Sequence, residues 1–271
     1  PPNELLRQVI DNGGYYDTDK LFFKNVANTT FASACAPPGG GRNPVSGRLL
    51  RHFNMIWMTN LSAESMITIF KAIGEGYFQH ELPRLASLAG HLAHASVAVY
   101  ETVTEKLLPT PKKSHYTFNL RDLSKVFQGI LMARKAQLAQ GEQQLVRLWF
   151  HEQFRVFRDR LVNTEDRKWF SDLCGECVTP YLENVEGMEL PIDVAAISNV
   201  MFGDFLTRED KVYQEITAPE KLPDFLTETL EEYNITYPTQ MHLVFFQDAV
   251  MHCARISRVL AQPRGNSLLV G

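Results

Sequence analysis

Two periodicities of apolar residues divide this chain, and they predict different kinds of structure. Residues 3–12 carry apolar side chains at helical spacing, and Asn12-Gly13-Gly14 ends that pattern. Short apolar runs bounded by glycine and proline then predict strands, with one short helix among them, at residues 21–23, 29–36, 44–51 (the helix) and 53–58. Because strands and helices would alternate here, residues 1–60 are typical of part of an α/β sheet.

From Ser62 onward the apolar residues recur every three or four positions over long stretches, which predicts helices. The predicted helices cover residues 62–78, 83–108, 120–139, 142–162 and 165–185. The fourth has one broad apolar stripe, made of Val146, Trp149, Phe150, Phe154, Phe157 and Leu161. Prolines, Gly141 and the cap sequence Asn163-Thr164 separate most of these helices. We therefore expect a helical bundle over residues 61–185.

The last part of the chain, residues 186–271, mixes the two patterns. It predicts a short strand at 212–216, helices at 222–233 and 241–260, and a closing strand at 266–271. The predicted fold class is therefore α/β but mostly helical, in three parts. These parts are an α/β piece (1–60), a helical subdomain (61–185) and the N-terminal segment of a second α/β module (186–271).

Charge and composition exclude several classes of function. The net charge of −4 provides no bulk attraction to nucleic acid or to anionic lipid. No uncharged apolar run reaches the length of a transmembrane helix, and the first residues do not form a signal peptide. The chain begins at proline rather than methionine, so we expect an internal segment of a longer protein.

Cysteine and histidine spacing gives weak indications of metal chemistry. The Cys174-Gly-Glu-Cys177 pair is typical of a redox motif or half a zinc site, but no second pair accompanies it. We favour buried structural thiols in a helix. His91 and His94 have ligand spacing without an evident third ligand, so we assign no metal site and favour ordinary core or surface histidines.

Two motifs resemble nucleotide-binding sequences and lack their essential residues. The glycine-rich stretch 36–42 has no Gly-Lys-Ser/Thr, so it is a tight turn rather than a phosphate-binding P-loop. Val9-Ile10-Asp11 resembles a Walker B strand, but it follows a helical pattern and carries a single carboxylate. The chain by itself therefore lacks the groups that hold a phosphate and Mg²⁺.

Two arginines are better candidates. Arg51 ends a short predicted helix just before a predicted strand, where a permanently charged guanidinium could reach a neighbour's phosphate. Arg121 lies in the first turn of a predicted helix, where the helix dipole disfavours a cation, so the position needs a reason. From the residues alone, an ordinary solvated or paired arginine remains the alternative for both positions.

Long stretches of the chain resemble axonemal dynein heavy chains, in order and from end to end. These stretches are PPNELLRQ (1–8), PPGGGRNP (37–44), LLRHF (49–53), LPTPKKSHYTFNLRD (108–122), RLWFHE (147–152), FGD (202–204) and QPRGNSLLVG (262–271). The resemblance implies that residues 1–185 correspond to the third AAA+ module of the motor ring after its Walker B strand, with a helical lid at 61–185. Residues 186–271 would begin the fourth module.

The resemblance also implies roles for individual residues. Arg51 matches the arginine finger that reaches the preceding module's nucleotide, with Arg48 as the competing candidate, and Arg121 matches sensor II of its own module. Ala36 occupies the sensor I position, where an alanine cannot orient an attacking water. Gly271 matches the first glycine of the next module's P-loop. Tyr213 and Ile216 fall at the adenine-contacting loop of that module, which is a weaker match.

The implied function is that of a segment of an ATP-driven, minus-end-directed microtubule motor in cilia and flagella. The parent would bind ATP or ADP with Mg²⁺, and the isolated segment would bind neither. Implied partners are the neighbouring AAA+ modules, microtubules and the dynein intermediate and light chains, with neither nucleic acid nor membrane; the implied location is the cytoplasmic cytoskeleton of the ciliary axoneme. Two alternatives remain open: a noncatalytic helical scaffold, and a segment of a non-motile AAA+ remodelling ATPase.

Overall fold

The structure, a computed structural model, describes residues 2–36, 44–134, 138, 141–183, 185, 192–197, 199–206 and 211–269. Residues 1–60 and 61–271 form two compact units, and each is described by itself. The glycine-rich stretch expected to form a turn at 37–42 lies outside the described residues, as does Gly271.

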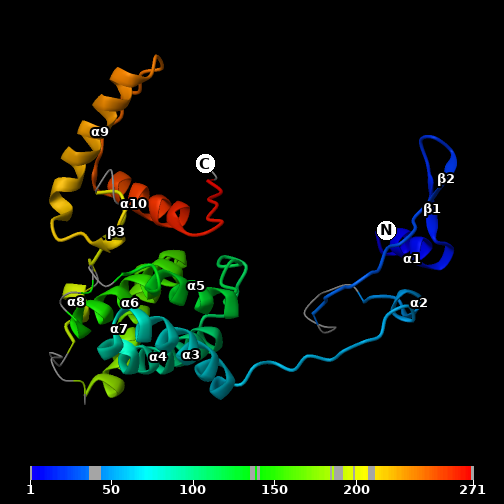
Figure 1. Cartoon of the computed structure of the whole chain (residues 1–271), viewed down its shortest axis with the longest axis horizontal. Helices are drawn as coiled ribbons and strands as arrows, with labels where there is room; N and C mark the ends of the chain where they lie inside the picture. The colour runs from blue at the N-terminus through cyan, green and yellow to red at the C-terminus, as the bar shows by residue number, and fades with distance from the viewer. Residues whose placement is uncertain are drawn as a thin grey trace. The chain divides into compact units, whose positions relative to one another are not determined.

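In the first unit, helix α1 (Pro2–Asn12) leads into a hairpin of β1 (Gly14–Asp17) and β2 (Phe22–Asn25), which pair antiparallel (Figure 1). Gly13, with φ +66°, lets the chain turn sharply out of the helix. A four-residue helix, α2 (Gly47–Leu50), follows and contacts α1. The helix expected at 3–12 is confirmed, whereas the hairpin's first strand was not anticipated.

Three expected strands do not form in the described part of the chain, because each lacks a neighbour to pair with there. Residues 29–36 and 54–58 form no strand, and neither do the described residues 266–269. A strand is stabilised by backbone hydrogen bonds to an adjacent strand, and none of the described residues provides one. Large apolar side chains consequently remain exposed, with Ile56 at 84% and Trp57 at 72%.

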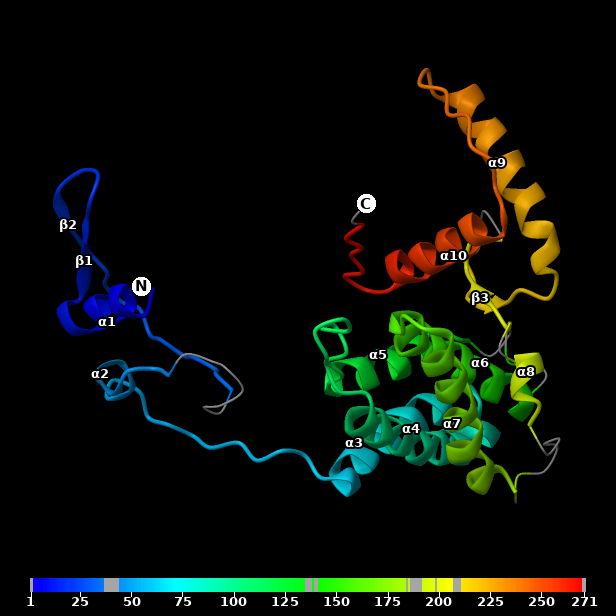
Figure 2. The same cartoon turned by 180° about the vertical axis from the view of Figure 1, so that it is seen from behind.

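Five long helices form the bulk of the second unit, and Figures 1 and 2 show them packed in a bundle. They are α3 (Ala63–Glu81), α4 (Ala86–Lys106), α5 (Leu120–Ile130), α6 (Glu142–Val156) and α7 (Thr164–Leu182), with the 3₁₀ turns η1 (Pro83–Leu85) and η3 (Arg158–Arg160) between them. Helix α3 packs along α4, α4 along α7, and α5 along α6. The helical bundle expected from the apolar periodicity is confirmed.

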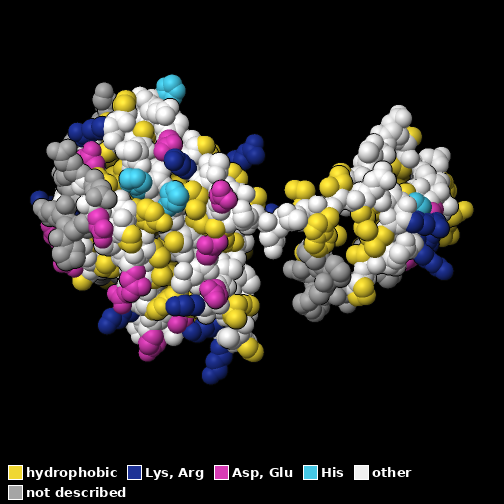
Figure 3. Space-filling view, turned by 90° about the horizontal axis from the view of Figure 1, so that it is seen from below, with side chains coloured by type: hydrophobic (Ala, Val, Ile, Leu, Met, Phe, Trp, Pro, Cys, Tyr) yellow, Lys and Arg dark blue, Asp and Glu magenta, His cyan; other side chains and the backbone are white. Residues whose placement is uncertain are grey.

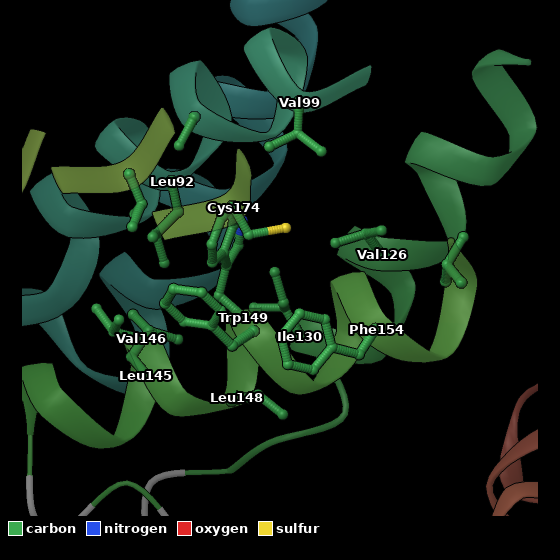
Figure 4. Close-up of a cluster of buried hydrophobic side chains, with 14 of the residues drawn as sticks. Leu92, Val99, Val126, Ile130, Leu145, Val146, Leu148, Trp149, Phe154 and Cys174 are labelled. Atoms are coloured by element: carbon green, nitrogen blue, oxygen red, sulfur yellow. The ribbon is translucent and has the colours of Figure 1, made fainter. Parts of the chain in front are cut away.

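The core of this bundle is built around α6 (Figure 4). All six residues of the predicted apolar stripe are buried. Trp149 is fully buried, and its indole N–H donates to Ser96 Oγ at 2.7 Å, while that hydroxyl donates to the Leu92 carbonyl at 2.6 Å. The large aromatic ring is therefore buried with its polar group satisfied, as burial of tryptophan requires.

Two helices are shorter than the sequence predicts. Helix α5 ends at Ile130 rather than near 139, and the Tyr77 hydroxyl donates at 2.9 Å to the carbonyl of Ala133 just beyond its end. Helix α6 ends at Val156 rather than 162, and the chain tightens there into η3.

The remaining described elements are α8 (Val194–Ile197), β3 (Phe202–Gly203), β4 (Gln214–Glu215), η4 (Pro219–Lys221), α9 (Leu222–Thr236) and α10 (Gln247–Ala261). Strands β3 and β4 pair antiparallel, so the short strand expected near 212–216 is confirmed. Helix α10 begins six residues later than predicted. The Asn234 side chain bonds both the N–H and the carbonyl of Met241, each at 2.8 Å, and holds that backbone outside a helix.

Charged side chains of both signs are interspersed on the face of the second unit drawn in Figure 3. Among the residues that the structure describes, none of the helices combines the length and apolar composition that a bilayer crossing requires.

Candidate functional site

Arg51 caps the C-terminal end of α2 and projects from the first unit. Its backbone N–H donates to the Gly47 carbonyl at 3.1 Å, which fixes the start of the side chain. The side chain is 60% exposed, and Nη2 donates to Asp11 Oδ1 at 2.8 Å. Arg48, on the same helix, is also exposed, and no partner is recorded for its guanidinium among the described residues. The two candidate finger residues therefore differ in that only Arg51 is anchored.

Asp11 anchors Arg51, and its carboxylate contacts three basic side chains in all. Besides Arg51, its carboxylate lies 2.8 Å from His52 Nε2 and 2.5 Å from Arg7 Nη1. The hydrogen bond from Arg51 is the largest cause of a lowered pKa of this carboxyl. The sequence-based rejection of Asp11 as a Walker B residue agrees with its position on α1. Its contact with Arg51, forty residues away, was missed because no local periodicity indicates it.

Arg121 is the second residue of α5, and a complete cap fixes the helix behind it. The Asn119 side chain accepts the backbone N–H of Arg121 at 2.9 Å, and Asp122 Oδ2 accepts the backbone N–H of Asn119 at 3.1 Å. The Arg121 side chain is exposed, and the described part of the chain offers its guanidinium no recorded ion pair or hydrogen bond. An exposed, unpaired cation in a rigid first turn is suited to meeting an anion.

The loop before α5 is fastened by Arg160, which sequence reasoning did not single out. Arg160 lies in η3 and donates to three acceptors: the carbonyls of His115 and Thr117, at 3.0 and 2.9 Å, and Asp122 Oδ2 at 3.0 Å. Its guanidinium also lies 4.7 Å from the centroid of the Phe118 ring. Arg160 thus connects both the cap of α5 and the loop that leads to it to η3.

Tyr213 and Ile216 lie together at β4, and both are buried. The Tyr213 hydroxyl donates to Glu152 Oε1 at 2.5 Å, and burial is the main cause of the raised pKa of this phenol. Ile216 packs in a small apolar cluster with Leu222 and Val250. Both side chains are therefore packed inside this segment, and the adenine contact that the resemblance implies for them stays a prediction.

The same tyrosine belongs to a buried polar joint between α6 and α10. Arg258 of α10 donates from Nε and Nη2 to both carboxylate oxygens of Glu152, which is 0% exposed. Burial alone would lower the pKa of Arg258, but the adjoining Glu152 raises it overall. Neighbouring His151 donates its Nδ1–H to the Val200 carbonyl at 3.0 Å, and burial lowers its pKa well below the ordinary value. The joint links segments that are 61 and 106 residues apart.

Two further ion pairs, at the edge of this joint, connect α6 and η3 to the last segment of the second unit. Arg147 of α6 bonds Glu215 of β4, and Arg255 of α10 lies 3.1 Å from Asp159 of η3. The last segment of the second unit is therefore attached to α6 and η3 by charged groups at its buried centre and at its rim.

The expected structural thiols are on α7, where Cys174 is fully buried and Cys177 half-buried. Burial raises the pKa of both thiols, which makes them poor nucleophiles and ligands. His91 and His94 lie against the ring of Tyr181. Among the described residues, no group of three or more metal-ligating side chains comes together.

One pocket of about 360 Å³ lies between α9, α10 and the end of β3. Its walls include Phe205, Phe225 and Cys253, and neither Tyr213 nor Ile216 lines it. Ala36, at the implied sensor I position, is exposed.

Comparison with known proteins gives this geometry a context. Residues 1–61 match the family described as the P-loop containing dynein motor region, residues 75–167 the dynein heavy chain ATPase lid domain, and residues 241–271 the P-loop containing dynein motor region D4. Over its whole length the chain is 44% identical to human dynein axonemal heavy chain 6 and 44% identical to human dynein axonemal heavy chain 1. The chain belongs to the axonemal dynein heavy chains. Human dynein axonemal heavy chain 12 is 39% identical, again over the whole chain.

The chain spans 6% of the length of heavy chains 1 and 6 and 9% of heavy chain 12. It is a part of the dynein motor region in which a lid match lies between two P-loop-region matches. The helical bundle built on α3–α7 contains the lid match, and α10 lies within the D4 match.

Proposed function

We propose that this segment transmits nucleotide state between adjacent AAA+ modules in the ring of an ATP-driven, minus-end-directed ciliary microtubule motor. Its parts would be the end of one α/β subdomain (1–60), a lid (61–185) and the start of the next module (186–271). The parent would bind ATP or ADP with Mg²⁺ and act in the axoneme on microtubules. The 271-residue chain has no Gly-Lys-Ser/Thr motif, so by itself it should not hydrolyse ATP.

The observation that carries the proposal is the anchoring of Arg51. A guanidinium that acts across a module boundary must be exposed, so that it can reach the neighbour's phosphate, and must also be restrained, so that little entropy is lost on contact. Arg51 is 60% exposed and is restrained by Asp11 of α1. The lid would be the second element that transmits the nucleotide state, because its helix α6 is joined to α10 through Glu152 and Arg258. Motion of the lid would therefore move the following segment.

The test is nucleotide affinity at the preceding module's site in the full-length heavy chain. Arg51→Ala should weaken that affinity about fivefold or more, the ordinary size of coupling between sites. Arg48→Ala is the matched control, because it removes the same charged group from the same helix without disturbing Asp11. Unchanged affinity in Arg51→Ala, or an equal loss in Arg48→Ala, would refute the finger assignment.

A further inference from the structure

Arg160 stands out among the polar groups of the second unit because it bonds both a loop and a helix cap. It is 30% exposed at the side chain, so its contacts are partly shielded from water. Its three acceptors include Asp122 Oδ2, the same oxygen that accepts the N–H of the cap residue Asn119. In return, His115 Nε2 lies 2.9 Å from the Arg160 carbonyl. The contact is thus reciprocal between η3 and the loop.

A second anchor holds the middle of the same loop. The buried Tyr116 hydroxyl accepts the N–H of Val162 at 3.0 Å and donates to Asp166 at 2.8 Å. Lys113 reaches the same Asp166 carboxylate at 2.5 Å. Tyr116 and Lys113 thus hold the middle of the loop, and Arg160 alone among these side chains contacts the cap of α5.

We infer that Arg160 is a positioning residue that sets the direction of Arg121 towards the phosphates of a nucleotide bound by its own module. The inference rests on the proposed function, in which the parent binds ATP or ADP, and on the sensor II role that the resemblance implies for Arg121. Arg121 is two positions after Asn119 and one before Asp122, so a shift of this cap moves the start of the Arg121 side chain directly. Arg160 supplies the planar fork that spans a carboxylate and two carbonyls, and a single lysine ammonium cannot span all three.

The experiment is a double-mutant cycle in the full-length heavy chain, with the P-loop lysines of the other modules replaced so that one site is observed. Affinities for Mg·ADP and for AMP are measured by calorimetry. Arg121→Ala should weaken ADP binding about tenfold or more, the effect of removing a charged hydrogen bond. Arg160→Gln should weaken it about threefold or more. Arg160→Lys should resemble Arg160→Gln rather than the native protein.

Two results would distinguish a positioning role of Arg160 from a purely structural one. The loss in Arg160→Gln should be larger for ADP than for AMP, and it should disappear when Arg121 is already alanine. Arg167→Gln is the control, since Arg167 donates to the Leu161 carbonyl at 2.8 Å and has no recorded bond to the loop. It should leave both affinities unchanged.

The possible failures are distinguishable. If Arg121→Ala has no effect on ADP binding, the proposed role of Arg121 is wrong, and the inference on Arg160 falls with it. If Arg121→Ala weakens ADP binding but Arg160→Gln does not, or adds the same loss in the Arg121→Ala background, only the positioning inference is overturned.

Discussion

Replacing Arg258 by methionine should strongly destabilise residues 61–271, because it leaves the carboxylate of Glu152 buried without its counter-ion. Glu152 is 0% exposed, and Tyr213 would then be its main remaining hydrogen-bond partner. Removing one partner of a buried ion pair costs about 3–5 kcal/mol. For a unit of this size, each kcal/mol lowers the melting temperature by about 2–4 °C. We therefore expect a fall of roughly 6–20 °C for Arg258→Met.

The same reasoning predicts a recovery when the whole joint is made apolar. In Glu152→Met/Arg258→Met/Tyr213→Phe no buried charge or hydroxyl is left unpaired, so the free energy of unfolding should return to within about 2 kcal/mol of the native value. Arg255→Met is the matched control on the same helix. Its side chain is 36% exposed and pairs with Asp159, so its loss should cost at most about 1 kcal/mol.

The assay is urea unfolding of the 271-residue chain, followed by circular dichroism and by tryptophan fluorescence, with thermal melting alongside. Coincidence of the two optical transitions establishes that one free energy describes each variant. A loss of under 1 kcal/mol in Arg258→Met would refute the reasoning. So would a triple variant as unstable as Arg258→Met.

Two further predictions use the same joint. Gly129→Ala should destabilise the protein, because an added Cβ would lie 1.8 Å from a carboxylate oxygen of Glu152. Gly76→Ala, in open space on α3, should instead stabilise it by about 0.5–1 kcal/mol. Both changes are measured by the urea midpoint, and midpoints that shift in the same direction would contradict the close packing at Gly129. His151, whose pKa is lowered by burial, is neutral in the folded state and charges on unfolding, so stability should be full above about pH 6.5 and decline as the pH falls below it. His151→Asn keeps a donor near the Val200 carbonyl and should flatten that decline between about pH 7.5 and 5; an unchanged slope would show that other groups cause it.

The sequence by itself determined the helical bundle and the family. Apolar residues at helical spacing specify α6, because its broad apolar stripe must be buried whatever packs against it, and all six stripe residues are buried. Long ordered motifs such as residues 108–122 identified the chain as axonemal dynein sequence, since a resemblance of that kind is carried by residue identity and needs no contact map. The capping box of Asn119 and Asp122 is also local, because the two residues lie three positions apart at the start of α5.

Tertiary structure decided the features that depend on partners distant in sequence. The apolar run 53–58 has strand composition, yet a strand also needs a neighbour, and the described residues supply none. Asp11 with Arg51, and Glu152 with Tyr213 and Arg258, meet across 40 to 106 residues. Charged residues look alike in a sequence whether they are solvated or paired. Only the packing that removes water from them decides whether a charge must find a partner, and which partner that is.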